Sequence, residues 1–285
     1  MTDPATHAAE SARTIAILGA GYVGAALASA TARAGVATFA VRRTAVPGVV
    51  AGVHWLAGDV AKGVVAELPD TLDAVVLALA PGRGADDYAA TYVAGARGAL
   101  DIARRTGARL VYTSSTGVYG VHDGAWVTEA TPRHGAGASH EALCAAEDVL
   151  LSQGAVPATV LRVVGIYGPG RDPAPRYRDP ASLARGGDYW VNLAHRDDIV
   201  AAIVHVLALD VAPPLLNCAD GSPTLARDVC TWLAERRGED ATRLAFTGAH
   251  APARSNQRVA STALQDTGWR PRFPTVRDGL MSLGH

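Results

Sequence analysis

A glycine-rich segment near the start of the chain has the spacing of a phosphate-binding loop. Residues 19–24, G-A-G-Y-V-G, fit G-x-G-x-x-G directly after the apolar run Thr14–Leu18. In such a loop the first glycine makes a tight turn, the second lets the backbone approach a pyrophosphate, and the third allows close helix–strand packing. A phosphate then lies on the free N–H groups of the following helix. The predicted dinucleotide contacts are Gly19, Gly21, Tyr22, Val23 and Gly24.

Two arginines follow the next apolar run. Val36–Val41 is predicted to be the second strand, and Arg42 and Arg43 come directly after it. A site selective for NAD usually has an acidic residue there to hold the ribose 2′-hydroxyl, whereas arginines suit the 2′-phosphate of NADP. The sequence therefore favours NADP over NAD, although a solvated strand end would also explain the pair. Asp59 could accept a hydrogen bond from the adenine amino group, or it could be an ordinary turn residue.

Only one lysine is present among 26 basic residues, so Lys62 is the single candidate for chemistry that needs an ammonium group. It is expected at the surface, in a loop region. A net charge of −1 and a charged fraction of 19% argue against nucleic-acid binding and against disorder. Three widely spaced cysteines without a C-x-x-C pair predict neither a disulfide framework nor a metal site. The N-terminus lacks a signal-like apolar segment, and the run Ala74–Ala80 is too short to cross a membrane, so a cytoplasmic protein is expected.

Apolar runs alternate with helical segments along the first part of the chain, which predicts a parallel sheet covered on both faces. The expected strands are 14–18, 36–41, 73–79, 109–113, 158–163 and 215–217, and the expected helices are 22–34, about 86–105, 139–153, 197–209, 224–237, 261–267 and 275–283. The fold class is therefore α/β, a Rossmann-type doubly wound parallel sheet with a smaller C-terminal substrate lobe. A flexible N-terminus over 1–13, a Rossmann domain over 14–167 and a mainly substrate-binding lobe over 168–285 are expected, with some late segments returning to the sheet. Residues 168–188 are rich in Pro, Gly and Arg and are predicted to form a long loop.

Four further motifs resemble those of the extended short-chain dehydrogenase/reductase family, the NAD-dependent epimerase/dehydratase group. Residues 113–120 (T-S-S-T-G-V-Y-G) resemble its S-S-x-x-V-Y-G segment, and residues 161–170 resemble L-R-x-x-x-x-Y-G-P-G. Residues 191–198 are similar to V-H-V-x-D, and residues 267–271 are similar to L-G-W-x-P. Together with the glycine loop, these motifs span nearly the whole chain.

The resemblance implies roles for residues at the carboxyl ends of the strands, where α/β sheets bind ligands. Ser115 matches the Ser/Thr that holds the reacting oxygen of the substrate, and Tyr119 would line the same pocket. His195 matches a family position, and a structural role is expected for it. Cofactor contacts are further expected from Leu79, Ala80, Thr113 and Ser114.

The catalytic Tyr-x-x-x-Lys pair of the family is missing. With Glu147 aligned to a glutamate late in the same helix, Ser139 occupies the tyrosine position and Leu143 the lysine position. No tyrosine in the chain has a lysine four residues later. His140 could supply the proton instead, or it could be a surface or helix-capping residue. The same alternatives apply to its neighbour and to three loop residues, namely Glu141, His122, Asp123 and His134.

Two functions remain open from the sequence. One is an NAD(P)-binding oxidoreductase or epimerase/dehydratase-like enzyme that acts on a small carbonyl or sugar-nucleotide-like substrate with a non-standard proton donor. The other is a catalytically weak or inactive NADP(H)-binding redox sensor or scaffold. No nucleic-acid or membrane partner is expected. The resemblance adds a homodimer formed through a helix pair as one option.

Overall fold

The computed structural model describes residues 13–44, 50–65, 67–81, 88–134, 136–152, 154, 156–248 and 256–285. The chain divides into two compact units, each assembled from separate stretches of sequence. Unit 1 takes its described residues from 1–118, 136–162 and 199–216, and unit 2 takes its residues from 119–135, 163–198 and 217–285. The predicted N-terminal segment lies almost entirely outside the described residues.

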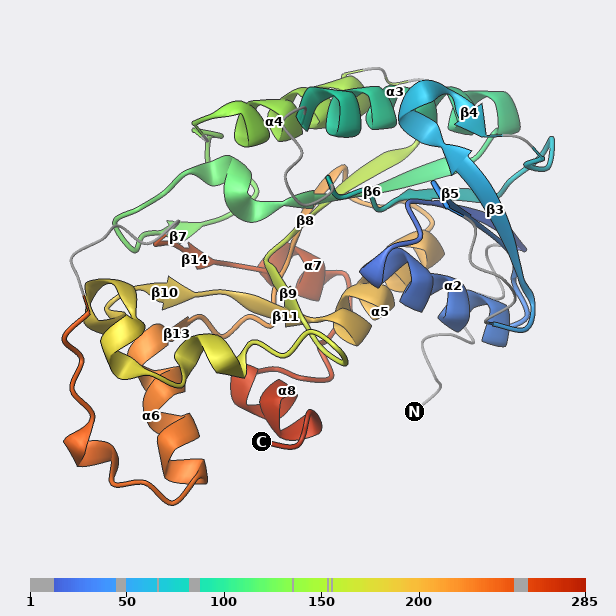
Figure 1. The fold of residues 1–285 in the computed structure, drawn as a ribbon. Helices are drawn as coiled ribbons and strands as arrows, with labels where there is room; N and C mark the ends of the chain where they lie inside the picture. The colour runs from blue at the N-terminus through green and yellow to red at the C-terminus, as the bar shows by residue number, and fades with distance from the viewer. Residues whose placement is uncertain are drawn as a thin grey trace. The chain divides into compact units, whose positions relative to one another are not determined.

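Unit 1 is built on a sheet with the strand order β12-β8-β6-β5-β1-β2-β3-β4 (Figure 1). The neighbours β1–β2, β2–β3, β1–β5 and β5–β6 pair in parallel, and the short β4 pairs antiparallel with β3. The strands are β1 (Thr14–Leu18), β2 (Ala37–Arg42), β3 (Val53–Asp59), β4 (Val64–Val65), β5 (Ala74–Leu77), β6 (Arg109–Ser115), β8 (Ala158–Val163) and β12 (Leu215–Cys218). The chain first runs outward from β1 to β3 and then crosses back to β5 on the other side of β1. This reversal creates a switch point between β1 and β5, where α/β sheets bind ligands.

Helices cover both faces of this sheet. The helices α3 (Tyr88–Thr106) and α4 (Ala138–Leu151) lie side by side on one face, and α2 (Tyr22–Arg33) and α5 (Arg196–Ala208) lie on the other (Figure 1). Central strands such as β5 are buried along their whole length, which explains why their sequences are continuously apolar. The main core under α3 and α4 is made of Val, Leu and Ala side chains, with Tyr112 as its largest member.

Unit 2 consists of short paired strands and helices around a smaller core. It contains the parallel pairs β9 (Gly165–Tyr167) with β11 (Leu193–His195) and β7 (Trp126–Val127) with β14 (Arg258–Val259), and the antiparallel pair β10 (Trp190–Val191) with β13 (Thr224–Leu225). Its helices are α6 (Ala226–Arg236), α7 (Thr262–Asp266) and α8 (Val276–Ser282). Residues 168–188 carry three short 3-10 turns. The core is formed by α6, α8 and residues of this segment.

The α/β fold class expected from the sequence is confirmed, and the six expected strands form within one or two residues of their predicted ends. The strand β3 was not predicted, because Val53–Asp59 contains His, Gly and Asp and is only half-buried. The two-residue strands of unit 2 were also missed, since they are too short to show a period of two. The domain boundary at residue 167 stays a prediction.

Candidate functional site

The three motif glycines have different surroundings. Gly19 has φ of +95°, and a Cβ there would lie 2.7 Å from the carbonyl oxygen of Ala78. A Cβ on Gly24 would lie 2.5 Å from the carbonyl oxygen of Gly19, because α2 packs closely on this turn. A Cβ on Gly21 would meet nothing within 4 Å. Gly19 and Gly24 are therefore required by the fold, whereas Gly21 keeps open the space above the loop.

This open space fits a pyrophosphate. Gly21 is the N-cap of α2 and provides no side-chain cap. The N–H groups in the first turn of an α-helix have no intrahelical acceptor, and the helix dipole makes this end favourable for an anion. The glycine loop and the first turn of α2, which we call the cradle, thus combine free space with N–H donors at the positive end of the helix dipole.

Hydrogen bonds tie the loop to the end of β2. The N–H groups of Gly19 and Ala20 both donate to the carbonyl oxygen of Val41, at 3.0 and 2.9 Å. Since Val41 directly precedes Arg42 and Arg43, the arginine pair lies beside the loop. The side chain of Arg42 is half-buried and that of Arg43 is exposed.

Asp59 ends β3 and caps the following 3-10 turn. Its Oδ1 accepts a hydrogen bond from the N–H of Ala61 at 3.1 Å, and its Oδ2 lies 4.0 Å from the Nζ of Lys62. The Lys62 side chain is 77% exposed, as expected for a surface residue. This geometry favours the turn interpretation of Asp59 over the adenine interpretation.

Ser115 and His140 flank the same small space in unit 1. A Cβ placed on Gly117 would lie 3.3 Å from Ser115 Oγ and 3.5 Å from His140 Nε2. Ser115 is the last residue of β6, and His140 lies in the first turn of α4. Because β1, β5 and β6 run parallel, Ser115 and the glycine loop follow strands at the same edge of the sheet.

The hydrogen bonds of His140 and Ser115 determine which of their polar groups remain available to a ligand. The Nδ1–H of His140 donates to the carbonyl oxygen of Ala136 at 2.5 Å, since a carbonyl can only accept. The Nε2 atom is thus the ring nitrogen outside this bond, and it lies 3.5 Å from a Cβ placed on Gly117. Ser115 Oγ accepts the N–H of Gly117 at 3.1 Å, which leaves its hydroxyl proton for another acceptor.

Behind Ser115, a buried ion pair joins three elements. Ser114 Oγ donates to Glu147 Oε1 at 2.6 Å, and Arg162 NH2 donates to Glu147 Oε2 at 2.6 Å. Glu147 is fully buried and Arg162 is only 3% exposed. The hydroxyl of Thr113 donates to the carbonyl oxygen of Leu77 at 3.2 Å. These contacts fix the end of β6, so the side chains of Thr113 and Ser114 serve the fold, and their predicted cofactor contacts stay predictions.

Several other predicted catalytic residues have structural partners. The side chain of Tyr119 is fully buried, and its hydroxyl donates to Asn217 Oδ1 at 2.6 Å, so its predicted role in the pocket stays a prediction. Asp123 caps a turn through the N–H of Ala125. Ser139 lies in the first turn of α4, and Leu143, at the position of the family's lysine, packs into the core at 5% exposure. Glu141, His122 and His134 are exposed.

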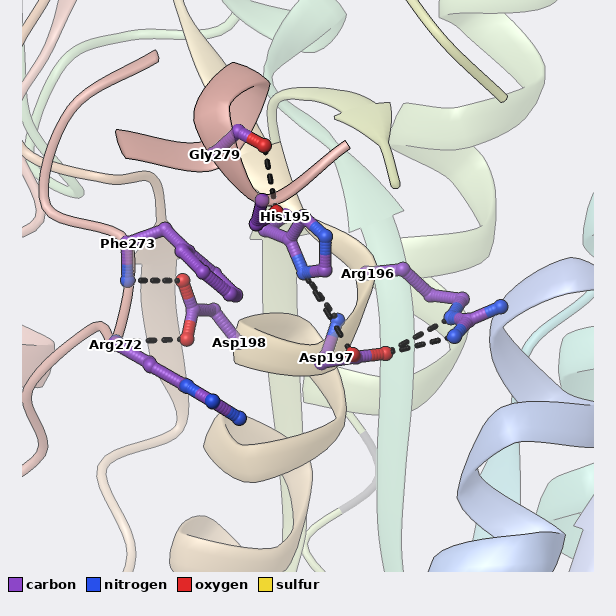
Figure 2. A network of polar contacts seen from close by, with 8 residues as sticks. His195, Arg196, Asp197, Asp198, Arg272, Phe273 and Gly279 are labelled. Carbon is purple, nitrogen blue, oxygen red and sulfur yellow. Dashed lines mark hydrogen bonds and ion pairs between the residues drawn. The ribbon is translucent and has the colours of Figure 1, made fainter. Parts of the chain in front are cut away.

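His195 is a packing residue of unit 2 (Figure 2). Its Nδ1 accepts the N–H of Asp197 at 3.2 Å, and its ring lies 4.3 Å from that of Phe273. Burial lowers the pKa of His195 and keeps the ring neutral. The next carboxylate, Asp198, accepts the N–H groups of Arg272 at 2.8 Å and Phe273 at 3.1 Å (Figure 2). These contacts agree with the structural role expected for His195.

No sequence motif indicated the parts played by Gly117 and Ala136. Gly117 keeps the space between Ser115 and His140 open, and Ala136 orients the imidazole. Both lie within a few residues of predicted site residues. A search for a carbonyl one helical turn before His140 could have found Ala136.

Comparison with known proteins places this site in a family. The model of the NAD dependent epimerase/dehydratase family matches residues 15–219. The chain belongs to that family.

Two solved structures are similar to this chain over most of its length and of their own. A solved Methylobacillus flagellatus protein, provisionally assigned as an NAD-dependent epimerase/dehydratase, is 28% identical with a TM-score of 0.76, over 95% of this chain and 97% of that one. The Bordetella bronchiseptica enzyme WbmG, solved with NAD, is 19% identical with a TM-score of 0.76 over 95% and 92%, which shows a shared fold. Protein YeeZ of Escherichia coli K12 is 36% identical over 122 residues, which cover 42% of this chain and 43% of YeeZ.

The described residues show neither a membrane-spanning helix nor a metal-binding cluster. None of their helices combines the length and apolar content that crossing a membrane needs. No cluster of three or more His, Cys, Asp or Glu residues suited to a metal ion occurs among them.

Proposed function

We propose that this protein is an NADP(H)-dependent oxidoreductase of the epimerase/dehydratase type, which acts on a small carbonyl or sugar-nucleotide-like substrate. The observation that carries the proposal is the juxtaposition of Ser115 Oγ and His140 Nε2 around Gly117. In this proposal these two side chains perform the work of the missing Tyr-Lys pair.

The glycine loop and the arginine pair would hold the cofactor. The space above Gly21 and the first-turn N–H groups of α2 suit the pyrophosphate. Arg42 and Arg43, tied to the loop through Val41, suit a 2′-phosphate by charge-assisted hydrogen bonds. When bound, a nicotinamide dinucleotide accepts or supplies a hydride.

Ser115 would hold the reacting oxygen. Its Oγ already accepts the N–H of Gly117, so its hydroxyl proton is available to the substrate oxygen. His140 would then transfer the proton. In reduction, the proton of the imidazolium Nε2 moves to the carbonyl oxygen; in oxidation, the neutral Nε2 takes the hydroxyl proton. The bond to Ala136 keeps the ring oriented in both directions.

Hydride transfer with variants at these positions tests the assignment. Purified protein is titrated with NADPH and then assayed against a panel of carbonyls and nucleotide sugars by loss of NADPH absorbance. We expect His140→Gln to lower kcat by about 10²–10⁴-fold with an unchanged Kd for NADPH, which is the usual range for a general acid–base. His134→Gln is the matched control, because His134 is exposed and belongs to unit 2. Turnover that is unaffected by His140→Gln would refute the role of His140.

A second test fills the space beside Gly117 with a methyl group. Gly117→Ala adds a methyl group within 3.5 Å of both Ser115 Oγ and His140 Nε2. The variant should bind NADPH normally but lose turnover, since the methyl group occupies the position between the two reacting side chains.

A cofactor-binding sensor or scaffold is the second candidate. It is favoured by the buried Leu143, which leaves no cation at the position of the family's lysine. NADPH binding without turnover of any substrate, unchanged by Ser115→Ala, would support it. Failure to bind either NADPH or NADH would refute both candidates.

The cofactor preference has its own experiment. We expect NADPH to bind more tightly than NADH, and the double variant Arg42→Ala/Arg43→Ala to remove the preference while NADH binding is retained. An unchanged ratio of the two dissociation constants would refute the role of the arginines.

The proposal extends to the location of the protein in the cell and to its oligomeric state. We infer a cytoplasmic enzyme, because the sequence has only three, widely spaced cysteines. We also infer a homodimer through the adjacent helices α3 and α4, which sedimentation analysis would test.

A further inference from the structure

Two tryptophans and an arginine form a cluster in unit 2, whereas Ser115 and His140 belong to unit 1. The guanidinium carbon of Arg258 lies 5.1 Å from the ring centroid of Trp126 and 5.1 Å from that of Trp190, over both ring faces. We call these three residues the tryptophan–arginine cluster. Contacts between a cation and two indole faces hold the guanidinium in a defined plane.

Strand pairing places two members of the cluster side by side. Trp126 and Arg258 are register partners in the parallel pair β7–β14. The next residues on the two strands, Val127 and Val259, are completely buried. Because side chains alternate along a strand, Trp126 and Arg258 lie on the outer face, where Trp126 is 51% exposed.

The third member is held by Asn256. Its Oδ1 accepts the N–H of Trp190 at 3.0 Å, and its carbonyl oxygen accepts the N–H of Gly124 at 2.8 Å. A Cβ on Gly124, which has φ of +84°, would lie 3.2 Å from Trp190 Nε1. The backbone around the cluster is therefore closely fitted to the indole.

The hydrogen-bond donors of Arg258 are mostly unused. Its Nε donates to the carbonyl oxygen of Gly124 at 2.7 Å. Within the described ranges, its two terminal nitrogens make no hydrogen bond and no carboxylate lies within 4.0 Å of it. Arg227, in the same unit, differs: it also contacts a ring, that of Phe246 at 5.6 Å, but its NH2 is paired with Asp188 at 2.6 Å.

We infer that the tryptophan–arginine cluster is a binding site for an oxyanion, a carboxylate or phosphate group of a small ligand. The terminal N–H groups of a guanidinium with a fixed plane match two oxygens of such a group. The half-exposed Trp126 ring adds an apolar surface for the part of the ligand that carries the anion. This inference does not depend on the proposed oxidoreductase activity, since it concerns binding within unit 2.

Indole resonances provide a direct test. The protein has five tryptophans, so their nitrogen-15 indole signals can be assigned with Trp126→Phe and Trp190→Phe. Sodium acetate, sodium benzoate and inorganic phosphate are titrated separately at constant ionic strength and pH. We expect saturable shifts for Trp126 and Trp190 only. Tighter binding of phosphate than acetate identifies a phosphate ligand, the reverse order identifies a carboxylate, and tighter binding of benzoate than acetate shows that the indole surface contributes.

Two arginine variants decide whether Arg258 is responsible. Arg258→Lys keeps the charge but loses the planar fork, and we expect about tenfold weaker binding. Arg227→Lys is the matched control and should bind as the unaltered protein does. Unchanged indole signals of Trp55, Trp232 and Trp269 show that Arg258→Lys is folded. Equal affinity of Arg258→Lys, or linear shifts of all five indoles, would overturn the inference.

Discussion

At the scale of single residues, unit 2 contains carboxylates whose protonation is set by burial. Asp220 is 5% exposed, and burial is the main reason that its pKa rises to about 8, with the nearby charges of Asp198 and Asp278 adding to the effect. Its Oδ1 accepts the N–H of Ser222 at 2.9 Å, which opposes the rise. At neutral pH this side chain is therefore mainly protonated in the folded protein.

The raised pKa predicts how stability changes with pH. The folded state keeps a proton that the unfolded chain, with an ordinary aspartate pKa near 4, releases. Stability is therefore highest below that value and falls as the pH rises towards about 8. Asp220→Asn removes this dependence, and we expect it to raise Tm at pH 8 but not at pH 4. Thermal unfolding across this range measures the difference, at roughly 2–4 °C for each kcal/mol.

A carboxyl whose pKa is shifted in the opposite direction provides a control in the same unit. Asp240 is exposed, and hydrogen bonds from Thr242 lower the pKa of its carboxyl. Asp240→Asn should not stabilise the protein at alkaline pH. If both variants shift Tm equally, the effect of Asp220→Asn is not due to burial.

The glycines give a second prediction at this scale. Gly21→Ala should leave Tm nearly unchanged, because its Cβ meets nothing within 4 Å, but should weaken NADPH binding by occupying the cradle. Gly24→Ala should lower Tm, because its Cβ would lie 2.5 Å from a backbone oxygen. Calorimetric unfolding and NADPH titration of both variants separate the two roles. A large loss of Tm in Gly21→Ala would contradict this assignment.

At the scale of elements, the Glu147–Arg162 pair joins α4 to β8, and its bond with Ser114 adds β6. Of these three elements, β6 carries Ser115 and α4 carries His140, and β8 supplies Arg162 to the ion pair. A buried ion pair contributes little net stability, but leaving one charge without its partner is costly.

This asymmetry can be measured with a double-mutant cycle. Arg162→Met alone should cost about 3–5 kcal/mol of unfolding free energy, because the buried Glu147 carboxylate loses the guanidinium that it contacts. The double variant Glu147→Leu/Arg162→Met should recover much of that loss. Urea unfolding of the single and double variants measures the coupling; additive losses would show that the pair does not act as a unit.

At the scale of the whole molecule, the chain passes repeatedly between its two units, and the dinucleotide cradle lies wholly within unit 1. A ligand that binds only the folded state stabilises it by mass action. We expect NADPH at about a hundred times its Kd to add about 2.7 kcal/mol, and NADH at the same concentration to add less. Scanning calorimetry with each nucleotide provides the comparison, and no shift with either would argue against dinucleotide binding.

Much of the fold could be predicted from local patterns. Strands such as Ala158–Val163 are continuously apolar because both faces of the sheet are covered, and the glycine spacing reflects contacts within one strand–turn–helix segment. The strand Val53–Asp59 could not be found this way, because its side chains are only half-buried. The cluster of Trp126, Trp190 and Arg258 could not be found either, since its members are up to 132 positions apart in the sequence.

The sequence by itself determined the class of cofactor loop and the absence of a Tyr-Lys pair, because both depend only on residue type and short spacing. Only the tertiary structure decided which contacts the candidate side chains make. Tyr119 turned inward to Asn217, whereas His140 faces the space beside Ser115. The physical reason is that a side chain's free atoms depend on which partners the fold brings to it. For His140 that partner is the carbonyl of Ala136, which occupies Nδ1 and leaves Nε2 near Gly117.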